Sequence, residues 1–236
     1  MLPTVHAPTR QARDVKLLAL ETCGDYCSVA LVCDGQVVER HVASPARHTE
    51  VLLPLCEEVR ATCGLALAQL DAVAFGAGPG AFTGVRVAAS AAHGIALAHD
   101  LPLVPISSLA ALAFGGWRLN GLHHQLAMLD ARRGELYWGA YIVRAEAEPL
   151  VIWQAACVTS SPAITVTLPR PWGVVGRGFE VLTASEVARL APDAIEHAEC
   201  RYPRARDVAA LAAIEIRAGR GMSAELALPI YLRAAL

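Results

Sequence analysis

Lysine is nearly missing from this chain of 236 residues. Nineteen of its twenty basic residues are arginine, and Lys16 is the one lysine. A P-loop lysine, a Schiff-base lysine or a serine–lysine pair would each have to use this residue, which precedes the first predicted strand. The sequence therefore excludes lysine-dependent phosphate binding and lysine-dependent covalent catalysis.

Cysteine pairs at metal-binding spacing are missing too. The seven cysteines form no C-x-x-C pair, and no histidine stands beside them at the spacing of a metal ligand. Cys23 and Cys27 could meet across a hairpin turn, but an odd number of cysteines in a cytoplasmic chain favours free thiols. We interpret the cysteines as small buried apolar residues, and no metal site is predicted.

No apolar run is long enough to span a bilayer. Hydrophobic residues make up 55% of the chain, but one arginine, two histidines and one aspartate interrupt the most apolar long stretch, Val85–Leu101. The run Leu17–Leu20 is too short for the core of a signal peptide. The sequence therefore predicts a cytoplasmic protein without membrane contact.

The net charge of −2 gives no electrostatic footprint for nucleic-acid binding by the chain alone. The C-terminal end is locally basic because it holds six arginines. These are Arg201, Arg204, Arg206, Arg217, Arg220 and Arg233. We interpret them as a solvated surface with ion pairs and do not expect the chain to bind nucleic acid on its own.

Period-two and helical apolar patterns predict an α/β protein. Residues 1–15 show no periodicity and are predicted to be a flexible tail. The next elements are strands over 16–20, 27–32 and 36–42, a helix over 48–63, a strand over 71–75, a glycine-rich turn, a helix over 85–98 and a strand over 101–106. The order is three antiparallel strands followed by alternating helices and strands.

The second half of the chain begins in the same way. Strands over 125–129, 136–143 and 150–158 form another antiparallel set, and Asp130 stands where Glu21 stands in the first half. We interpret this as an internal duplication. Only a strand over 173–176 and helices over 179–190 and 207–218 are predicted beyond it, so the second copy is expected to be truncated.

The glycine-rich turn is the first candidate site. It runs from a strand into a helix N-terminus, an arrangement that can present free N–H groups to a phosphate. Glu21 and Asp130 end strands where phosphotransferases of two-lobed folds keep a carboxylate. The candidate nucleotide-binding residues are Gly76, Gly78, Gly80, Thr83, Glu21 and Asp130. A packing role for the glycines, and backbone hydrogen bonds for the two carboxylates, remain open alternatives.

The helix after the turn carries small residues on nearly every face, so it can pack closely against other helices. We expect it to share an apolar partner surface with the helix over 48–63. The predicted interface residues are Leu52, Leu55, Cys56, Val59, Val85, Ala88, Ala89 and Ala92. The alternative is that both helices only cover a sheet.

Several segments together resemble the TsaB (YeaZ) family. They are GAGPGAFTGVR at 76–86, LALETCGDYCSVAL at 18–31, LPLVPISSLAALA at 101–113, DARRGELY at 130–137 and PIYLR at 229–233. The resemblance implies an actin-like (ASKHA, RNase H-like) fold of two duplicated lobes, here 16–106 and a truncated 107–236. It covers nearly all of the chain from residue 16 and is loosest between about residues 144 and 225.

The resemblance also implies a function. TsaB-like proteins are degenerate relatives of TsaD and act without catalysis in forming threonylcarbamoyladenosine beside the anticodon of tRNAs that read ANN codons. The implied partners are a TsaD-like transferase and a TsaE-like ATPase, with a homodimer when the chain is alone. The H-x-x-x-H metal pair of TsaD falls on Ser108 and Leu112, which cannot replace imidazoles. No cofactor is expected beyond weak binding of ATP or ADP.

A different class of function is an actin-like ATPase or small-molecule kinase that uses the turn Gly76–Gly84. Such enzymes need an intact adenosine-binding region and a positioned base in the second lobe, where the sequence shows no glycine-rich turn with an acidic residue. A metalloprotease would need a ligand set that the sequence lacks. The sequence thus favours a subunit that holds partners.

Overall fold

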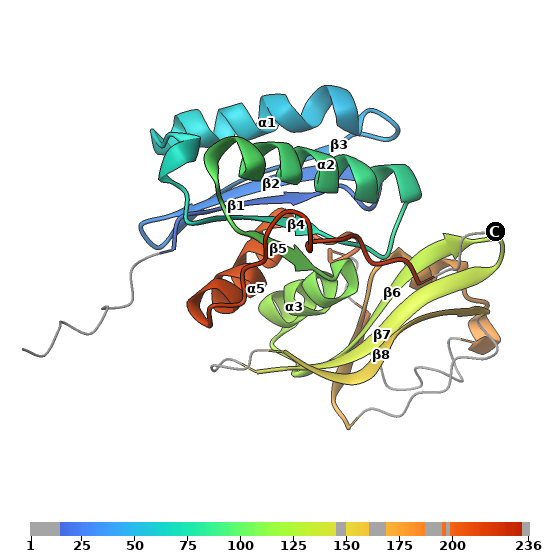
Figure 1. The fold of residues 1–236 in the computed structure, drawn as a ribbon. Coiled ribbons are helices and arrows are strands. Elements are labelled where there is room, and N and C mark those ends of the chain that lie inside the picture. Colours follow the sequence, from blue (N-terminus) through green and yellow to red (C-terminus); the bar gives the residue numbers. More distant parts are fainter. Residues whose placement is uncertain (1–14, 145–149, 161–168, 187–194, 197–198, 233–236) are drawn as a thin grey trace, which may run out of the picture.

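Two five-stranded sheets form the framework of the protein (Figure 1). The computed structural model describes residues 15–144, 150–160, 169–186, 195–196 and 199–232. Nearly all of the predicted tail over 1–15 lies outside these residues. Among the described residues no helix has the length and apolar character that a membrane span requires.

The first sheet has the order β3-β2-β1-β4-β5. Its strands are β1 (Leu17–Glu21), β2 (Tyr26–Cys33), β3 (Gln36–Ala43), β4 (Ala72–Gly76) and β5 (Leu103–Ile106). The first three strands pair antiparallel, whereas β4 and β5 continue the sheet in parallel with β1. The predicted meander and the two parallel strands are thus confirmed.

The second sheet repeats this topology in the order β10-β9-β6-β7-β8. Its strands are β6 (His124–Arg132), β7 (Glu135–Val143), β8 (Leu150–Ser160), β9 (Trp172–Val175) and β10 (Ile195–Glu196). As in the first sheet, the central strand pairs antiparallel with its hairpin neighbour and parallel with the strand on its other side. The repeat confirms the internal duplication.

The helices are divided between the two sheets. They are α1 (His48–Cys63), α2 (Phe82–His99), α3 (Ser108–Asn120) and α5 (Ala205–Arg217), with short 3-10 helices η1 (Leu67–Gln69) and η3 (Arg177–Val181). Helices α1 and α2 cover one face of the first sheet, α5 covers its other face, and α3 packs on the second sheet (Figure 1). The chain thus returns to the first sheet with its last helix.

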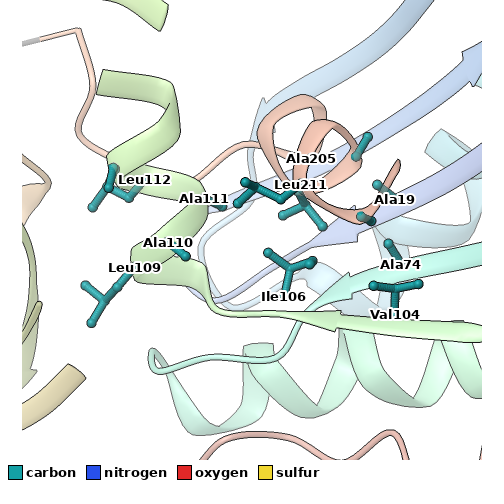
Figure 2. Close-up of a cluster of buried hydrophobic side chains, with 14 of the residues drawn as sticks. Ala19, Ala74, Val104, Ile106, Leu109, Ala110, Ala111, Leu112, Ala205 and Leu211 are labelled. Carbon is teal, nitrogen blue, oxygen red and sulfur yellow. The ribbon is translucent and has the colours of Figure 1, made fainter. Parts of the chain in front are cut away.

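Alternation along the strands explains this layering, because successive side chains point to opposite faces of a sheet. In β1, Leu18 and Leu20 join the core under α1 and α2. Leu17 and Ala19 face the other way and join the core that contains α3 and α5. Figure 2 shows this second core, where small side chains of β1 and β4 face α5.

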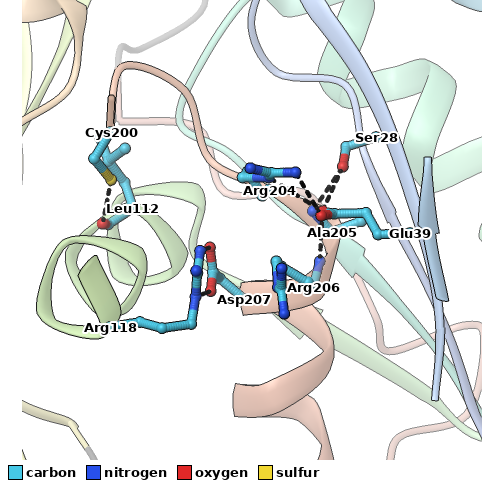
Figure 3. Close-up of polar contacts among 9 residues, drawn as sticks. All are labelled: Ser28, Glu39, Leu112, Arg118, Cys200, Arg204, Ala205, Arg206 and Asp207. Atoms are coloured by element: carbon cyan, nitrogen blue, oxygen red, sulfur yellow. Dashed lines mark hydrogen bonds and ion pairs between the residues drawn. The ribbon is translucent and has the colours of Figure 1, made fainter. Parts of the chain in front are cut away.

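The buried N-terminus of α5 is satisfied by side chains from the first sheet. Its first N–H groups have no intrahelical partner, and Arg204 at the N-cap provides no side-chain bond. Ala205 N donates to Ser28 Oγ at 3.0 Å, and Arg206 N donates to Glu39 Oε1 at 3.2 Å (Figure 3). The Glu39 carboxylate is also well placed against the positive end of the helix.

A buried ion pair fixes α5 to α3. Both oxygens of Asp207, a side chain only 3% exposed, accept from Arg118, with Nε–Oδ1 at 2.8 Å and Nη2–Oδ2 at 3.1 Å (Figure 3). Burial raises the pKa of Asp207, and the arginine opposes that rise by stabilising the charged form. The two lobes therefore meet where α3, which packs on the second sheet, contacts α5, which packs on the first.

Most predicted elements are confirmed, with two differences. Helix α2 begins at Phe82, three residues before the predicted start, which shortens the glycine-rich turn. The prediction of a helix over 179–190 is wrong at its start, because Arg177–Val181 is a 3-10 helix and residues 182–183 are not helical. Residues 187–190 lie outside the described residues. The predicted domain boundary after residue 106 lies between the two sheets in the sequence. It remains a proposal, because α5 follows this boundary in the chain and yet packs on the first sheet.

We predict that Arg118→Met lowers the free energy of unfolding by about 3 kcal/mol, because it leaves the buried Asp207 carboxylate without its partner. Burial already raises the folded-state pKa of Asp207, and loss of the arginine would raise it further, so this stability is lost as pH rises from the unfolded pKa through the folded one. The loss of unfolding free energy caused by Arg118→Met should therefore be smaller at about pH 4 than at about pH 7. Urea unfolding at both pH values measures it.

The double variant Arg118→Met/Asp207→Leu serves as the control, since removing both charges should restore most of the lost stability. An equal loss of unfolding free energy in the single and double variants would show that packing of the aliphatic part of Arg118, and not the ion pair, holds α5.

Candidate functional site

The glycine-rich turn packs against the end of β1. A Cβ atom at Gly84 would lie 1.9 Å from Thr22 O, and one at Gly80 would lie 2.5 Å from Cys23 Cβ. Ala81 N donates to Cys23 O at 2.7 Å, and Ala77 N donates to Ile106 O at 2.8 Å. The turn therefore uses its small residues and two of its N–H groups to hold neighbouring strands.

Glu21 lies under this turn and not in an open site. Its side chain is buried, with Oε1 accepting from Cys23 N at 2.7 Å and Oε2 accepting from Ser108 Oγ at 2.8 Å. Burial raises its pKa, while these hydrogen bonds act in the opposite direction. A Cβ at Gly76 would lie 1.9 Å from Glu21 Oε2, so the glycine provides the space for the carboxylate.

The two positions that the resemblance compares with a metal pair of TsaD are occupied by buried side chains. Ser108 is fully buried and donates to Glu21, and Leu112 is fully buried in the core around α3. Within the described residues no group of three or more histidine, cysteine, aspartate or glutamate side chains could hold a metal ion. The local chemistry at Ser108 and Leu112 is therefore that of a core.

A cleft of about 280 Å³ lies between the lobes. It brings Gly80 and Asp130 together, but Glu21, Gly76 and Gly78 do not line it. Asp130 accepts from Arg132 N at 2.7 Å within its own turn, which is the local role that turn carboxylates often have. Two of the six candidate nucleotide-binding residues therefore line the cleft.

A polar bridge that the sequence analysis missed crosses this cleft. Arg177 Nη1 of η3 donates to Asp25 Oδ2 and to Tyr202 Oη, both at 2.8 Å. Tyr202 Oη in turn donates to Asp25 Oδ2 at 3.0 Å. Asp25 lies in the turn between β1 and β2, so the bridge ties the first lobe to the second. No local sequence motif predicts this bridge, because its three residues are far apart in the chain.

Three of the C-terminal arginines are ion-paired. Arg201 lies 2.8 Å from Glu180 Oε1, Arg204 lies 2.7 Å from Glu39 Oε2, and Arg220 lies 2.5 Å from Glu215 Oε2. The expectation of ion pairs is confirmed for these three residues.

The predicted interface residues are in the core, which corrects that prediction at the level of side chains. All eight, from Leu52 to Ala92, are buried inside the chain, with exposed fractions between 0% and 6%. The physical reason is that helical periodicity marks the apolar stripe of a helix, and the stripe of each helix faces the sheet. The alternative of covering the sheet accounts for these eight side chains.

The same two helices nevertheless present a second, exposed apolar surface. A groove of about 500 Å³ lies between α1 and α2. Its described lining residues are Thr49, Leu52, Leu53, Phe82, Thr83, Arg86, Val87, Ser90 and Ala91. Leu53 is 57% exposed and Phe82 is 58% exposed. Sequence periodicity did not single out these two residues, because they lie off the main apolar stripe.

Comparison with known proteins gives consistent matches over most of the chain. Residues 41–233 match the TsaD family model, described as tRNA N6-adenosine threonylcarbamoyltransferase. The tRNA threonylcarbamoyladenosine biosynthesis protein TsaB of Escherichia coli is 33% identical over 93% of this chain and 95% of its own length. The protein of the same name from Haemophilus influenzae is 42% identical over 55% of each chain.

Solved structures agree with these sequence matches. YeaZ from Pseudomonas aeruginosa superposes with a TM-score of 0.84 at 34% identity, over 92% of this chain and all of that one. A second structure from that organism, described as an uncharacterized protein with similarity to peptidase YeaZ, also has a TM-score of 0.84 at 34% identity, over 93% of this chain and all of that one. The resemblance and the actin-like fold predicted from the sequence are thus confirmed, and this chain belongs to the TsaB (YeaZ) family.

Proposed function

We propose that this chain is a cytoplasmic, non-catalytic subunit in the synthesis of threonylcarbamoyladenosine in tRNA. It pairs with a TsaD-like transferase, works with a TsaE-like ATPase, forms a homodimer when alone and contacts tRNA only through the complex. The observation that carries this proposal is the exposed apolar groove between α1 and α2. Family membership gives the pathway, and the groove gives a surface for a partner.

The groove has the character of a protein-binding surface. A contiguous exposed apolar patch that is rimmed by polar residues is typical of a protein–protein interaction site. Leu53 of α1 and Phe82 of α2 are more than half exposed, while Leu52 beside them is buried. A partner helix in this groove would cover the exposed pair and extend the packing of α1 and α2.

The buried carboxylate and the core positions support a non-catalytic role. Glu21 bonds to Cys23 N and Ser108 Oγ inside the protein, so it has no free oxygen directed at the cleft. Ser108 and Leu112 provide no metal ligand in place of the histidine pair of TsaD. A reaction at this site would require groups that the fold uses for packing.

An actin-like ATPase or kinase is the second candidate, and the cleft between the lobes favours it. The N-terminal end of α2 and Asp130 both line this cleft, and a helix N-terminus attracts phosphate. The engaged N–H groups of Ala77 and Ala81 oppose it. We therefore rank nucleotide turnover below the subunit role and propose at most weak binding of ATP or ADP.

The isolated chain should neither hydrolyse ATP nor transfer a threonylcarbamoyl group to tRNA, because the described residues that line the cleft do not form a catalytic arrangement. Phosphate release and tRNA modification by the purified chain measure this. Asp130→Asn is the matched control for any residual signal. Turnover that disappears in this variant belongs to the chain itself and would establish the kinase alternative, whereas turnover that persists comes from a contaminant.

A pair of arginine substitutions separates the surface from the core. Leu53→Arg should fold normally but bind a TsaD-like protein at least tenfold more weakly, because Leu53 is exposed in the groove. Ala92→Arg should fail to fold, because it places an unpaired charge where the side chain is fully buried. Circular dichroism melting and calorimetry with the TsaD-like protein test both. Normal binding by a folded Leu53→Arg variant would exclude the groove as the interface.

The C-terminal arginines should not be an RNA contact. In the double variant Arg201→Gln/Arg206→Gln, tRNA modification by the complete complex should keep its rate and its salt dependence. A contact with phosphates would instead lower the rate and reduce the salt slope. Arg204 is left unchanged because its ion pair with the buried Glu39 carboxylate helps to hold α5.

A further inference from the structure

One arginine at the edge of the groove between α1 and α2 has an unusual environment. Arg86 is exposed on α2, and its guanidinium carbon lies 3.6 Å from the centroid of the Phe82 ring. Its Nε donates to Tyr231 Oη at 3.2 Å, and the Tyr231 ring lies 6.0 Å away. Stacking on one ring and bonding to the other restrict the side chain, and a planar guanidinium suits both contacts.

The C-terminal segment provides the second ring and is itself anchored. Ile230 N donates to Ala77 O at 2.7 Å, directly before Tyr231. Met222 and Leu103 exchange two backbone hydrogen bonds of 2.8 Å each, and Ala227 between these anchors is fully buried. The position of the guanidinium is therefore set by a segment 145 residues away in sequence.

Arg86 has no acidic partner within the described part of the chain. Nine other described arginines form ion pairs with aspartate or glutamate, whereas the bond from Arg86 goes to a neutral phenol. Among the described residues that line the groove, it alone carries a charge. A restrained cation thus lies beside apolar side chains with its terminal amino groups available.

The start of α2 adds to the positive potential here. Ala81 at the N-cap offers no side-chain bond to the first N–H groups of the helix, and Ala81, Phe82 and Thr83 are all exposed. The N-terminal end of a helix attracts negative charge. The cation and the helix end therefore favour the same kind of group in a partner.

We propose that Arg86 recognises a carboxylate on the helical face of the partner subunit that enters this groove. The inference rests on the proposed function and adds the chemistry by which the partner is selected. An apolar groove with a single cation fits an apolar helix face that carries one acidic side chain. A nucleic acid would require several cations along its path, and a guanidinium matches a carboxylate with two parallel hydrogen bonds. The aromatic contacts hold the guanidinium group of Arg86 in position to form these hydrogen bonds.

The test uses the full chain and a purified TsaD-like protein encoded by the same genome. Calorimetry compares the wild type with Arg86→Gln, Arg86→Lys and Arg217→Gln at about 0.05 M and about 0.5 M salt, which differ several-fold in screening length. Arg217 is the matched control, because it is an exposed arginine at the end of α5, on the opposite face of the first sheet. Thermal melting confirms that each variant is folded.

Arg86→Gln should weaken binding at low salt by at least about tenfold and should remove most of the salt dependence. Arg86→Lys should retain the salt dependence with an intermediate affinity, since it keeps the charge but not the planar fork. Arg217→Gln should bind as the wild type does. Wild-type binding together with unchanged affinity and salt dependence in Arg86→Gln would refute this inference and leave the proposed function intact. A wild-type chain that does not bind would overturn both.

Discussion

Helix α5 lies against the first sheet although it follows the second sheet in the sequence, and this return of the chain holds the two lobes together. A buried helix must satisfy its first N–H groups and any charge that it carries. Ser28 and Glu39 of the first sheet do this for its N-terminus, and Arg118 of α3 does it for Asp207. The relation between the sheets thus depends on a few polar contacts within an apolar core.

This arrangement also shows how much the sequence could predict. Local patterns were sufficient for α1, whose predicted and observed bounds agree, for both antiparallel strand sets and for the duplication. Those features depend on neighbours in sequence. The return of α5 to the first sheet was not predicted, because nothing in the pattern of residues 205–217 says which sheet its apolar face will cover.

The candidate sites show the same limit. Helical spacing identified Leu52, Ala88 and Ala92 as apolar, but spacing cannot tell a stripe that faces a sheet from one that faces a partner. In the structure these three side chains are buried, and the exposed apolar side chains of the two helices include Leu53 and Phe82. The bridge from Arg177 to Asp25 joins residues 152 positions apart, so it could not be read from any local motif.

The glycine-rich turn illustrates how a motif can persist while its use changes. In a phosphate-binding turn the absent side chains leave room for a ligand. Here the space beside Gly76, Gly80 and Gly84 is filled by Glu21, Cys23 and Thr22. Gly80 and Gly84 allow the chain to approach Cys23 and Thr22 closely, and Gly76 leaves room for the Glu21 carboxylate. These packing roles explain a conspicuous sequence motif at a place where neighbouring strands are held together.

The path of the C-terminal segment has a practical consequence for how this protein is handled. Ile230 is bonded to the turn that leads into α2, so the carboxyl end of the described chain lies beside the groove. The start of β1 lies at the opposite end of the strands, because Leu17 pairs with Ala72 at the beginning of β4, whereas the turn follows the end of that strand. Affinity tags and fluorescent labels should therefore be attached at the amino terminus, where they do not crowd the surface under study.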